Sequence, residues 1–381
     1  TPSYHPRFGG LENSAREYAL FIKKKGYQVK VITNKYPYNL PKNEVIDGIE
    51  VKRYLFLHNP LEYLKSKRFD LFFAWIIIKP LTLFRLMALF IKKKPVVVNV
   101  HFPDNQLLEL VILNFFFRSN LVLSFHGDEV ERLQKVKKNS FRYILYLRIL
   151  KQSNYLTFCS NYLLKKFRTI FYDSNKSNFL VIANGINKKI NSTSLIEQKK
   201  DYIFSAARFV SKKGLSMIFD IFNTRTLEKL EVAGGDIYEA EKISSNISTN
   251  INFLGVLDRT QIINKLKFAK LTIVPSIKEP YGIIVAEAIC CGSPLVATNV
   301  GGIPEIIDSI RNKLDKYNQK IFDSWVVIVE PNKKSIEMGI DSIIANKNPI
   351  NEYLVLVKSF RSQFLWDNKL KKLYSRIGNF D

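Results

Sequence analysis

Two glutamates eight residues apart, Glu279 and Glu287, have the spacing that most suggests chemistry. On a helix this separation corresponds to a rise of roughly 12 Å. The paired carboxyls of glycosidases lie roughly 5 to 9.5 Å apart, so these two glutamates do not suit one reacting atom. They suit hydrogen bonds to two separate parts of a long, hydroxyl-rich ligand.

The segment that carries both glutamates, residues 274–288, is expected to join a strand, a loop and a helix. Pro280 and Gly282 stand near the predicted start of the helix. The first amides of a helix have no acceptor within the helix, so they can hold oxygens of an anionic or hydroxyl-rich ligand.

Two histidines and a glycine pair are further candidates. His126 and His101 each end a predicted strand, which is where a doubly wound sheet places its ligand crevice. A single histidine in such a position is more often structural. Gly9 and Gly10 permit a close approach of the backbone to a ligand, although a glycine pair is often only a turn.

The elements that must position these residues alternate between strands and helices. We predict strands at residues 29–33, 96–100, 121–125, 202–206, 229–233, 251–254, 271–274, 294–298 and 325–329. Such a series predicts one parallel sheet in each half, covered by helices on both faces. The length of 381 residues also favours two domains, and polar residues 187–200 are the expected linker.

The start of the chain lacks an expected strand. Gly9-Gly10 should follow a strand, yet Tyr4-His5-Pro6 is a poor strand sequence. We therefore expect that a buried first strand is missing, and that its absence would leave two neighbouring strands unpaired. No secretory leader is visible before this point, although the natural N-terminus could lie further upstream.

The amino-acid composition indicates the cellular compartment of the protein and the classes of partner that it could bind. The three cysteines (Cys159, Cys290 and Cys291) lack a disulfide or zinc spacing, which favours a reduced, cytoplasmic protein. Net charge is +24, with +19 in residues 1–195 and +5 in residues 196–381. Such a field attracts nucleic acid, anionic lipid or a phosphorylated substrate, unless it reflects solvated surface lysines. Residues 71–91 are interrupted by Lys79, Pro80 and Arg85, which argues against a spanning helix.

Several segments together resemble the retaining glycosyltransferases of family 4, over nearly the whole chain. The glutamate pair resembles the E-x7-E motif of that family. The other resembling segments are Pro6 to Glu12 (glycine-rich loop), Asn184-Gly185-Ile186 (interdomain turn), Arg208 to Gly214 (R-x4-K-G motif), Cys291 to Thr298 and Gly301 to Glu305. Their order and spacing make the combined signal specific.

The resemblance implies roles for individual residues. Glu287 would bind the ribose hydroxyls and Glu279 the donor sugar, assisted by backbone amides at Gly282, Ile283 and Ile284. Arg208 and Lys213 would neutralise the diphosphate, a task that a metal ion performs in other transferases. No metal is therefore expected, and the chain has no Asp-x-Asp triplet. His126 would lie near the reacting sugar, and Gly9, Gly10 and His101 would contact substrate.

The fold implied is α/β: two Rossmann-like, doubly wound parallel-sheet domains facing a central cleft, called GT-B. We expect an acceptor domain in residues 1–195, a nucleotide-sugar domain in 196–359, and a closing helix over about 360–381 that packs back on the first domain. The implied reaction transfers a sugar from a nucleoside diphosphate sugar to an acceptor hydroxyl with retention, in cell-surface glycan or glycolipid assembly.

Three other functions remain open. A nucleotide-sugar epimerase uses the same scaffold and would form product from the donor alone. A non-catalytic binding protein is compatible with the missing strand. A nucleic-acid-binding protein would fit the charge, but the sequence shows no zinc finger, RNP motif or KH loop, so no nucleic acid partner is expected.

Two apolar segments suggest a membrane surface. Residues 81–91 form an apolar helix that ends in three lysines, and residues 111–117 form another, followed by Arg118. Apolar residues flanked by cations suit an interfacial helix, a lipid-linked acceptor and a peripheral location at the inner face of the membrane. The alternative is that both helices simply cover a sheet.

Overall fold

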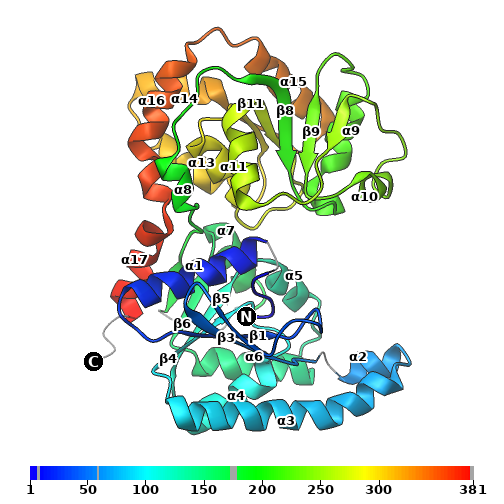
Figure 1. Cartoon of the computed structure of the whole chain (residues 1–381), viewed down its shortest axis with the longest axis vertical. Coiled ribbons are helices and arrows are strands. Elements are labelled where there is room, and N and C mark those ends of the chain that lie inside the picture. The colour runs from blue at the N-terminus through cyan, green and yellow to red at the C-terminus, as the bar shows by residue number, and fades with distance from the viewer. Residues whose placement is uncertain (7–8, 58–59, 172–177, 378–381) are drawn as a thin grey trace. The chain divides into compact units, whose positions relative to one another are not determined.

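The computed structural model describes residues 1–6, 9–57, 60–171 and 178–377, which form two compact units (Figure 1). Unit 1 contains Thr1–Cys159, Leu163–Ile182 and Leu370–Asp381, and unit 2 contains Ser160–Tyr162 and Ala183–Lys369. The main crossing into unit 2 thus precedes residue 195. The expected linker instead forms a short helix, α8 (Lys188–Ser192), which buries Ile190.

Unit 2 contains one sheet of six parallel strands in the order β10-β9-β8-β11-β12-β13. The strands are β8 (Lys200–Ala206), β9 (Leu230–Ala233), β10 (Ile251–Phe253), β11 (Ala269–Val274), β12 (Leu295–Thr298) and β13 (Val326–Val329). The order reverses direction between β8 and β11. A ligand crevice is expected at the carboxyl ends of the strands that flank such a reversal.

Helices cover this sheet because its strands are apolar on both faces. Ile273 and Val296 on one face, and Leu295 and Ala297 on the other, are fully buried. The helices of unit 2 after α8 are η1 (Ser211–Lys213), α9 (Leu215–Phe222), α10 (Ile237–Glu241), α11 (Arg259–Phe268), α12 (Ile283–Cys290), α13 (Ile303–Arg311), α14 (Lys316–Trp325), α15 (Lys333–Ile344), α16 (Ile350–Phe360) and η2 (Arg361–Phe364).

Unit 1 contains two sheets where one was predicted. The first has the order β1-β3-β2, from β1 (Lys30–Asn34), β2 (Asn43–Ile46) and β3 (Ile49–Tyr54). The second has the order β4-β5-β6-β7, from β4 (Val97–His101), β5 (Asn120–Phe125), β6 (Tyr155–Phe158) and β7 (Phe179–Val181). Among the described residues no strand joins β1 to β4, and this is why the sheet is divided.

The helices of unit 1 lie on both sides of these strands. They are α1 (Gly10–Lys24), α2 (Pro60–Lys65), α3 (Phe69–Lys93), α4 (Leu107–Phe117), α5 (Asp128–Gln134), α6 (Phe141–Gln152) and α7 (Asn161–Arg168), which begins at the boundary with unit 2. Figure 1 shows α1 on one side of the strands and α3 and α4 on the other.

Helix α3 is longer than the sequence suggested, because it continues through Pro80. By length and composition alone it could cross a membrane, and 22% of its most apolar stretch is buried. Lys79, which argued against a spanning helix, is buried: its Nζ lies 2.8 Å from Glu109 Oε1 and donates to Asn105 O. This cation therefore belongs to the interior of unit 1.

The last described helix, α17 (Trp366–Ile377), begins in unit 2 and ends in unit 1. Its second half packs within unit 1, where the Tyr374 ring lies edge-on to Phe21 and Tyr27. Tyr155 Oη donates a hydrogen bond to Arg376 O. The closing helix predicted over 360–381 thus consists of η2 and α17 in its described part; residues 378–381 lie outside the described residues.

Candidate functional site

The loops that follow β8 and β11 bring together two of the predicted residues. Lys213, in η1, places its Nζ 2.5 Å from Glu279 Oε2. Ser276 Oγ donates to the same carboxylate oxygen at 3.2 Å. Both side chains are largely buried, so the ion pair is shielded from water and strengthened by low local dielectric. A charged pair therefore lies at the reversal of strand order.

Backbone contacts fix these two loops against each other. Ile277 N and Lys278 N both donate to Lys212 O. Gly214 has a φ of +66°, and a Cβ there would lie 1.9 Å from Pro275 O, so the approach requires glycine. These contacts determine where Lys213 and Glu279 meet.

A second glycine supports Glu279 from the other side. Gly301 has a φ of +61°, and a Cβ at this position would lie 1.8 Å from Glu279 O. The neighbouring Gly302 N donates to that same carbonyl at 2.9 Å. The loop after β12 therefore holds the backbone of Glu279 in place. Gly301 is needed because no side chain would fit in this close approach.

Glu287 lies on α12 and is 1% exposed. Its carboxylate forms an ion pair with Arg259, the first residue of α11. The α11 start is fixed by a capping box in which Asp258 accepts from Gln261 N. Sequence reasoning did not identify Arg259, because the only signal there, Asp258 followed by Gln261, indicates a helix start and not a partner.

The assumed helical spacing of the two glutamates is wrong. Helix α12 begins at Ile283, after Gly282 with a φ of +94°, so Glu279 belongs to a loop. A rise of 1.5 Å per residue therefore does not apply across the whole interval. The first α12 amide bonded within the helix is Val285 N, to Gly282 O; the amides of Ile283 and Ile284 precede it. Glu279 in the loop and Glu287 on α12 therefore lie in distinct environments.

Arg208 is exposed in the loop between β8 and η1. Its carbonyl accepts from Val210 N at 2.8 Å. It therefore shares a loop with Lys213, in the same unit as Glu279 and Glu287. The predicted diphosphate residues and the predicted donor-binding glutamates all lie in unit 2.

The two predicted histidines contact each other in unit 1. His101 Nδ1 lies 3.0 Å from His126 Nε2, and the rings stack with centroids 5.3 Å apart. Tyr18 packs edge-on against His101. Among the described residues His126 Nδ1 has no hydrogen-bond partner. His101 is thus positioned to orient His126.

Burial controls the charge of this pair. Burial, and secondly the charge of the Thr1 amino group, lower the pKa of His126 to about 4. Burial also lowers the pKa of His101, with the charge of His126 as the second cause. Both imidazoles are therefore neutral near pH 7 and can accept a proton or a hydrogen bond.

Glu129 was not predicted, yet it fixes the loop that carries His126. Its carboxylate accepts from His126 N and, at 3.0 Å, from Gly127 N. Burial raises the pKa of Glu129 to about 7, although these backbone hydrogen bonds oppose the shift. Glu129 is the second residue of α5, whose N-cap is Gly127, so no capping-box pattern in the sequence pointed to it.

Gly9 and Gly10 begin α1 and are exposed. Gly9 has an extended φ of −178°, which any residue adopts, so its backbone does not require glycine. A Cβ at Gly9 would meet only the flexible end of Glu12. Arg7 and Phe8, in the predicted glycine-rich loop, lie outside the described residues.

Known protein families match both halves of the chain. The profile described as Glycosyltransferase Family 4 matches residues 8–189, and that described as Glycosyl transferases group 1 matches residues 187–356. An uncharacterized glycosyltransferase of Methanocaldococcus jannaschii is 25% identical, over 98% of this chain and 95% of its own length.

Two further similarities concern characterised proteins. A GDP-mannose-dependent monoacylated alpha-(1-6)-phosphatidylinositol monomannoside mannosyltransferase of Corynebacterium glutamicum is 26% identical over 50% of this chain and 55% of its own. The solved sucrose-phosphate synthase from Thermosynechococcus elongatus superposes with a TM-score of 0.71 at 17% identity, covering 100% of this chain and 96% of its own. Together with the two family profiles, these matches show that the chain belongs to the glycosyltransferases of the GT-B fold.

Proposed function

We propose that this glycosyltransferase takes its sugar from a nucleoside diphosphate sugar and transfers it to an acceptor hydroxyl with retention of configuration. The observation that carries the proposal is the Lys213–Glu279 ion pair, buried where the strand order of unit 2 reverses. Doubly wound sheets bind nucleotides at such a reversal. The mannosyltransferase of Corynebacterium glutamicum is GDP-mannose-dependent, which supports a nucleotide-linked donor.

In this proposal the candidate residues of unit 2 bind different parts of the donor. Glu287, held by Arg259, accepts hydrogen bonds from the ribose hydroxyls. Glu279, oriented by Lys213 and Ser276, accepts from hydroxyls of the donor sugar. The amides of Gly282, Ile283 and Ile284 hold donor oxygens at the start of α12.

The bond to the leaving phosphate breaks as the bond from the acceptor oxygen forms on the same face of the sugar. The acceptor proton passes to the leaving phosphate, so no enzymic nucleophile is required. Arg208 and Lys213 stabilise the negative charge that develops on the diphosphate. We propose that these two cations do the work of a metal ion, so the reaction needs no metal.

For unit 1 we propose a catalytic role for His126, which contacts the reacting sugar. A neutral imidazole can accept a hydrogen bond from a sugar hydroxyl. His101 acts through its contact with His126, and Gly9 and Gly10 allow the substrate to approach the start of α1.

A metal-chelation assay paired with Lys213 variants tests this mechanism. We expect transfer to survive EDTA, and Lys213→Ala to lower kcat by about 10²- to 10³-fold, the effect of removing one transition-state donor. Lys213→Arg should retain more activity. Lys212→Ala is the matched control, because its backbone carbonyl still holds the Ile277 and Lys278 amides.

Three outcomes would contradict the proposal. Complete inhibition by EDTA that Mg²⁺ or Mn²⁺ restores would exclude the metal-free mechanism. A product formed from donor alone would indicate an epimerase. An inverted anomeric centre in the NMR spectrum of the product would exclude retention.

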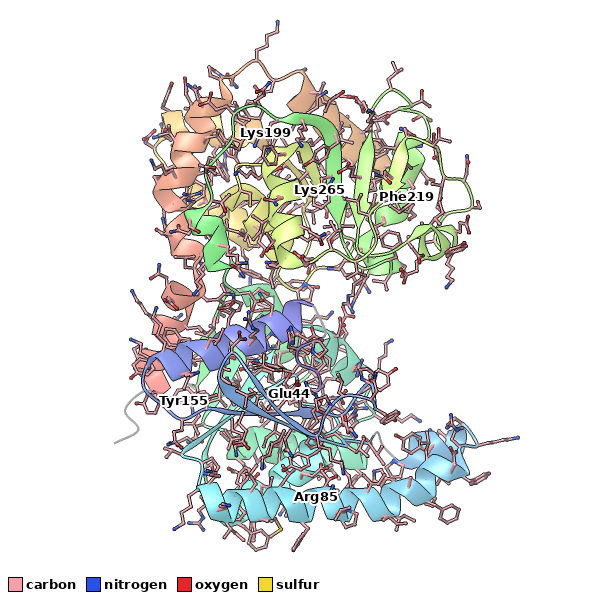
Figure 2. The ribbon with its side chains drawn as sticks, viewed as in Figure 1. Glu44, Arg85, Tyr155, Lys199, Phe219 and Lys265 are labelled. Carbon is pink, nitrogen blue, oxygen red and sulfur yellow. The ribbon has the colours of Figure 1, made fainter. Side chains whose placement is uncertain are left out.

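We also propose that the acceptor is lipid-linked and that unit 1 works on the inner face of a membrane, in cell-surface glycan or glycolipid assembly. We call the exposed apolar residues of α3 and α4 the α3 surface; they are Phe69, Phe73, Ile76, Ile77, Leu81, Phe84, Ile91, Phe115 and Phe116. Figure 2 shows side chains that project from α3 on the side away from the strands, with Arg85 among the labelled residues.

The cations at the ends of α3 and α4, and the acceptor of one relative, support a lipid-linked acceptor. Helix α3 ends in Lys92 and Lys93, followed by Lys94, and α4 is followed by Arg118. Cations beside an apolar surface suit anionic lipid headgroups. The Corynebacterium glutamicum relative acts on a phosphatidylinositol monomannoside. The three cysteines are free, which suits the reducing cytoplasmic side.

A further inference from the structure

The loop that follows β4, residues 102–106, is held in one conformation by hydrogen bonds from three side chains. Gln106 Nε2 donates to Phe102 O at 2.9 Å, and Tyr146 Oη and Lys79 Nζ donate to two further carbonyls of the loop. Phe102 itself has a φ of +56°, a left-handed conformation that a bulky side chain rarely adopts. Such strain persists only where the surroundings impose it, and it is frequent at ligand-binding sites.

Asp104, in this loop, binds two arginines from different helices. Arg132 Nη1 of α5 lies 2.7 Å from Asp104 Oδ2, and Arg142 Nη2 of α6 contacts Oδ1. The Asp104 side chain is 4% exposed, whereas the side chains of Arg132 and Arg142 are 53% and 24% exposed. Solvent therefore meets the two guanidiniums and not the carboxylate. One positive charge of these three groups is left uncompensated.

A second contact fixes the Arg132 guanidinium. Its central carbon lies 5.4 Å from the centroid of the Phe102 ring, a distance typical of a cation–π contact. A guanidinium has five N–H donors. Among the described residues, Asp104 is the only hydrogen-bond acceptor of the Arg132 side chain. The other donors of this fixed group are available to a ligand.

Both arginines contact a loop at the carboxyl edge of the second sheet of unit 1. The loop with Asp104 directly follows His101, and α5 follows the segment that carries His126. Three exposed lysines between α5 and α6 have no ion-pair partner in the described part of the chain; they are Lys135, Lys137 and Lys138. A cationic region therefore lies at the same edge of the sheet as the histidine pair.

The chemistry of the two guanidiniums suits a phosphate ester. Guanidiniums with fixed planes present paired N–H donors, which bind phosphate oxygens in a bidentate manner. A phosphate ester carries negative charge and several acceptor oxygens, so it can use both arginines at once. A neutral sugar would leave their charge without a partner. Because Arg132 is half exposed, the phosphate can belong to a larger molecule.

We propose that Arg132 and Arg142 bind a phosphate group of the acceptor. Asp104 is a positioning residue that holds both guanidiniums, and Phe102 orients one of them. The acceptor is thus a phosphate ester whose hydroxyl reacts at this edge of unit 1. A lipid that is joined to its sugar through phosphate has this chemistry. The acceptor role rests on the proposed glycosyl transfer, whereas binding of a phosphate ester requires no reaction.

Titration calorimetry of the full chain tests the proposal with two probes. Inorganic phosphate tests recognition of the ion alone, and glycerol phosphate tests a phosphate that is joined to a larger group. Glycerol is the uncharged control. The variants are Arg132→Gln and Arg142→Gln. Arg311→Gln is the matched control, because Arg311 is an exposed arginine of unit 2 that is also paired with an aspartate, Asp323.

We expect saturable binding of glycerol phosphate to the parent. Arg132→Gln and Arg142→Gln should each weaken it about 10- to 100-fold, the effect of one hydrogen bond between charged groups. Arg311→Gln should bind this probe as the parent does. Lys213→Ala should do the same, because Lys213 belongs to the proposed donor site of unit 2 and not to unit 1.

Hydrogen exchange of the parent locates the ligand without any substitution. Glycerol phosphate should slow the exchange of backbone amides in residues 102–106 and 128–142. Protection confined to unit 2 would overturn the proposal. This measurement decides the question even if Arg142→Gln fails to fold.

Four calorimetric results would overturn the proposal. They are the absence of saturable binding in the parent, equal binding by the parent and Arg132→Gln, loss of binding in Lys213→Ala, and binding of inorganic phosphate but not of glycerol phosphate. The last result would show that the site holds a free ion. None of these measurements needs turnover, so a failure of the proposed transfer reaction is detected separately, as the absence of product from the donor.

Discussion

At the scale of single residues, Glu287 gives the sharpest prediction, because its buried carboxylate has Arg259 as its ion-pair partner. Glu287→Gln keeps the size of the side chain but removes its charge. A hydrogen bond to a charged group contributes about 1.5–3 kcal/mol, so we expect the donor KM to rise roughly 10- to 100-fold. Steady-state kinetics at saturating acceptor measure the effect. An unchanged KM in a folded variant would remove Glu287 from the donor site.

Two buried groups, Glu129 at the start of α5 and His126 just before it, make opposite contributions to the stability of the protein in acid. The pKa of Glu129 is raised from 4.5 to about 7, so its stabilising contribution is present below pH 4.5 and lost as the pH rises through 7. The pKa of His126 is lowered from 6.5 to about 4, so its contribution is present above pH 6.5 and lost as the pH falls through 4. Between these limits the two effects partly cancel.

Removal of the ionisable Glu129 carboxyl should therefore reveal the stability that is lost when His126 becomes protonated. We expect Glu129→Gln to lose more stability than the parent on acidification from pH 7 to 4.5, by on the order of 2 kcal/mol. Thermal unfolding at several pH values measures this slope. Glu131→Gln, on the same helix, is the control. Parallel pH profiles for the parent and Glu129→Gln would show that the carboxyl is not buried in its neutral form.

The sequence identified residues of this site only where a short motif contained them. Lys213 and Glu279 were predicted because they match the R-x4-K-G and E-x7-E motifs of the family that the chain resembles, and the fold brings the two side chains into contact. Arg259 could not be found, since its contact with Glu287 joins helices distant in the chain. A pairing of this kind depends on how α11 and α12 pack, which local patterns do not encode.

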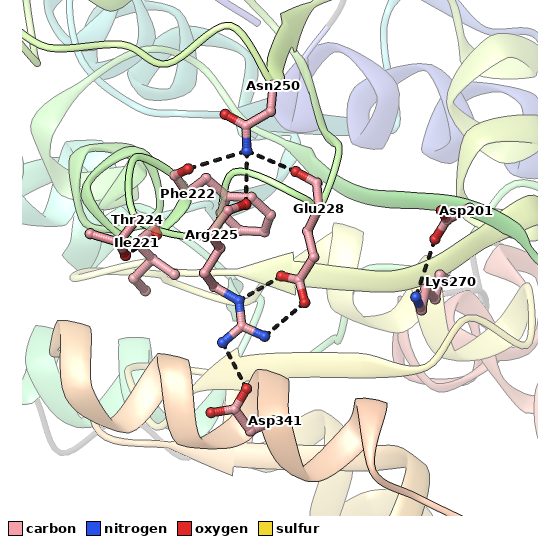
Figure 3. A network of polar contacts seen from close by, with 9 residues as sticks. All are labelled: Asp201, Ile221, Phe222, Thr224, Arg225, Glu228, Asn250, Lys270 and Asp341. Atoms are coloured by element: carbon pink, nitrogen blue, oxygen red, sulfur yellow. Dashed lines mark hydrogen bonds and ion pairs between the residues drawn. The ribbon is translucent and has the colours of Figure 1, made fainter.

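At the scale of elements, one asparagine holds the turn between α9 and β9. Figure 3 shows Asn250 Nδ2 donating to three carbonyls, those of Phe222, Arg225 and Glu228. In the same network the Arg225 guanidinium contacts both oxygens of Glu228 and one of Asp341. The turn therefore depends on one side-chain donor from outside it, Asn250.

We expect Asn250→Ala to lower the free energy of unfolding of unit 2 by about 1–3 kcal/mol, because the carbonyls lose a shared donor. Chemical denaturation followed by tryptophan fluorescence measures the loss. Asp201→Asn is the control: its partner Lys270 is also in Figure 3, but the pair is exposed, so we expect a change within about 0.5 kcal/mol. Equal losses in the two variants would show that the asparagine has no special role.

Strands were predictable where apolar residues run without interruption. The runs at 202–206 and 271–274 correspond to β8 and β11, each within two residues at either end. The hairpin of β2 and β3 was missed, although Ile49 and Val51 of β3, which are buried, alternate with Glu50 and Lys52 as in a half-buried strand. Its turn, Asp47-Gly48, was a usable signal. The strands β6 and β7 are short, with three or four residues, and give little periodicity.

At the scale of the whole molecule, charge and exposed apolar residues both concentrate in the N-terminal half. Residues 1–195 contain +19 of the net +24. The α3 surface belongs to this half, and most of its side chains point away from the core. Exposed apolar patches of this kind mark contacts with a partner or a membrane. The sequence predicted the charge asymmetry directly, but which face of α3 is exposed required the structure.

The proposed membrane contact gives a prediction with two separable parts. We expect co-sedimentation with anionic vesicles at low salt, with weaker binding to neutral vesicles and at high salt. A triple change of Lys92, Lys93 and Lys94 to alanine should weaken anionic binding up to about hundredfold, because each cation near the surface contributes roughly 1 kcal/mol. This variant tests the electrostatic part alone.

The apolar part is tested by Phe73, Ile77 and Phe84, which are 63%, 70% and 70% exposed and can become serine without a cavity. Their combined change should weaken binding at least about tenfold at any salt concentration, since apolar side chains bind the interface independently of charge. The matched control changes Leu227 and Val256, 97% and 76% exposed in unit 2, to serine. We expect this control to bind as the parent does. Equal recovery of the parent in the supernatant with neutral and anionic vesicles at low salt would contradict the membrane proposal and favour a soluble acceptor.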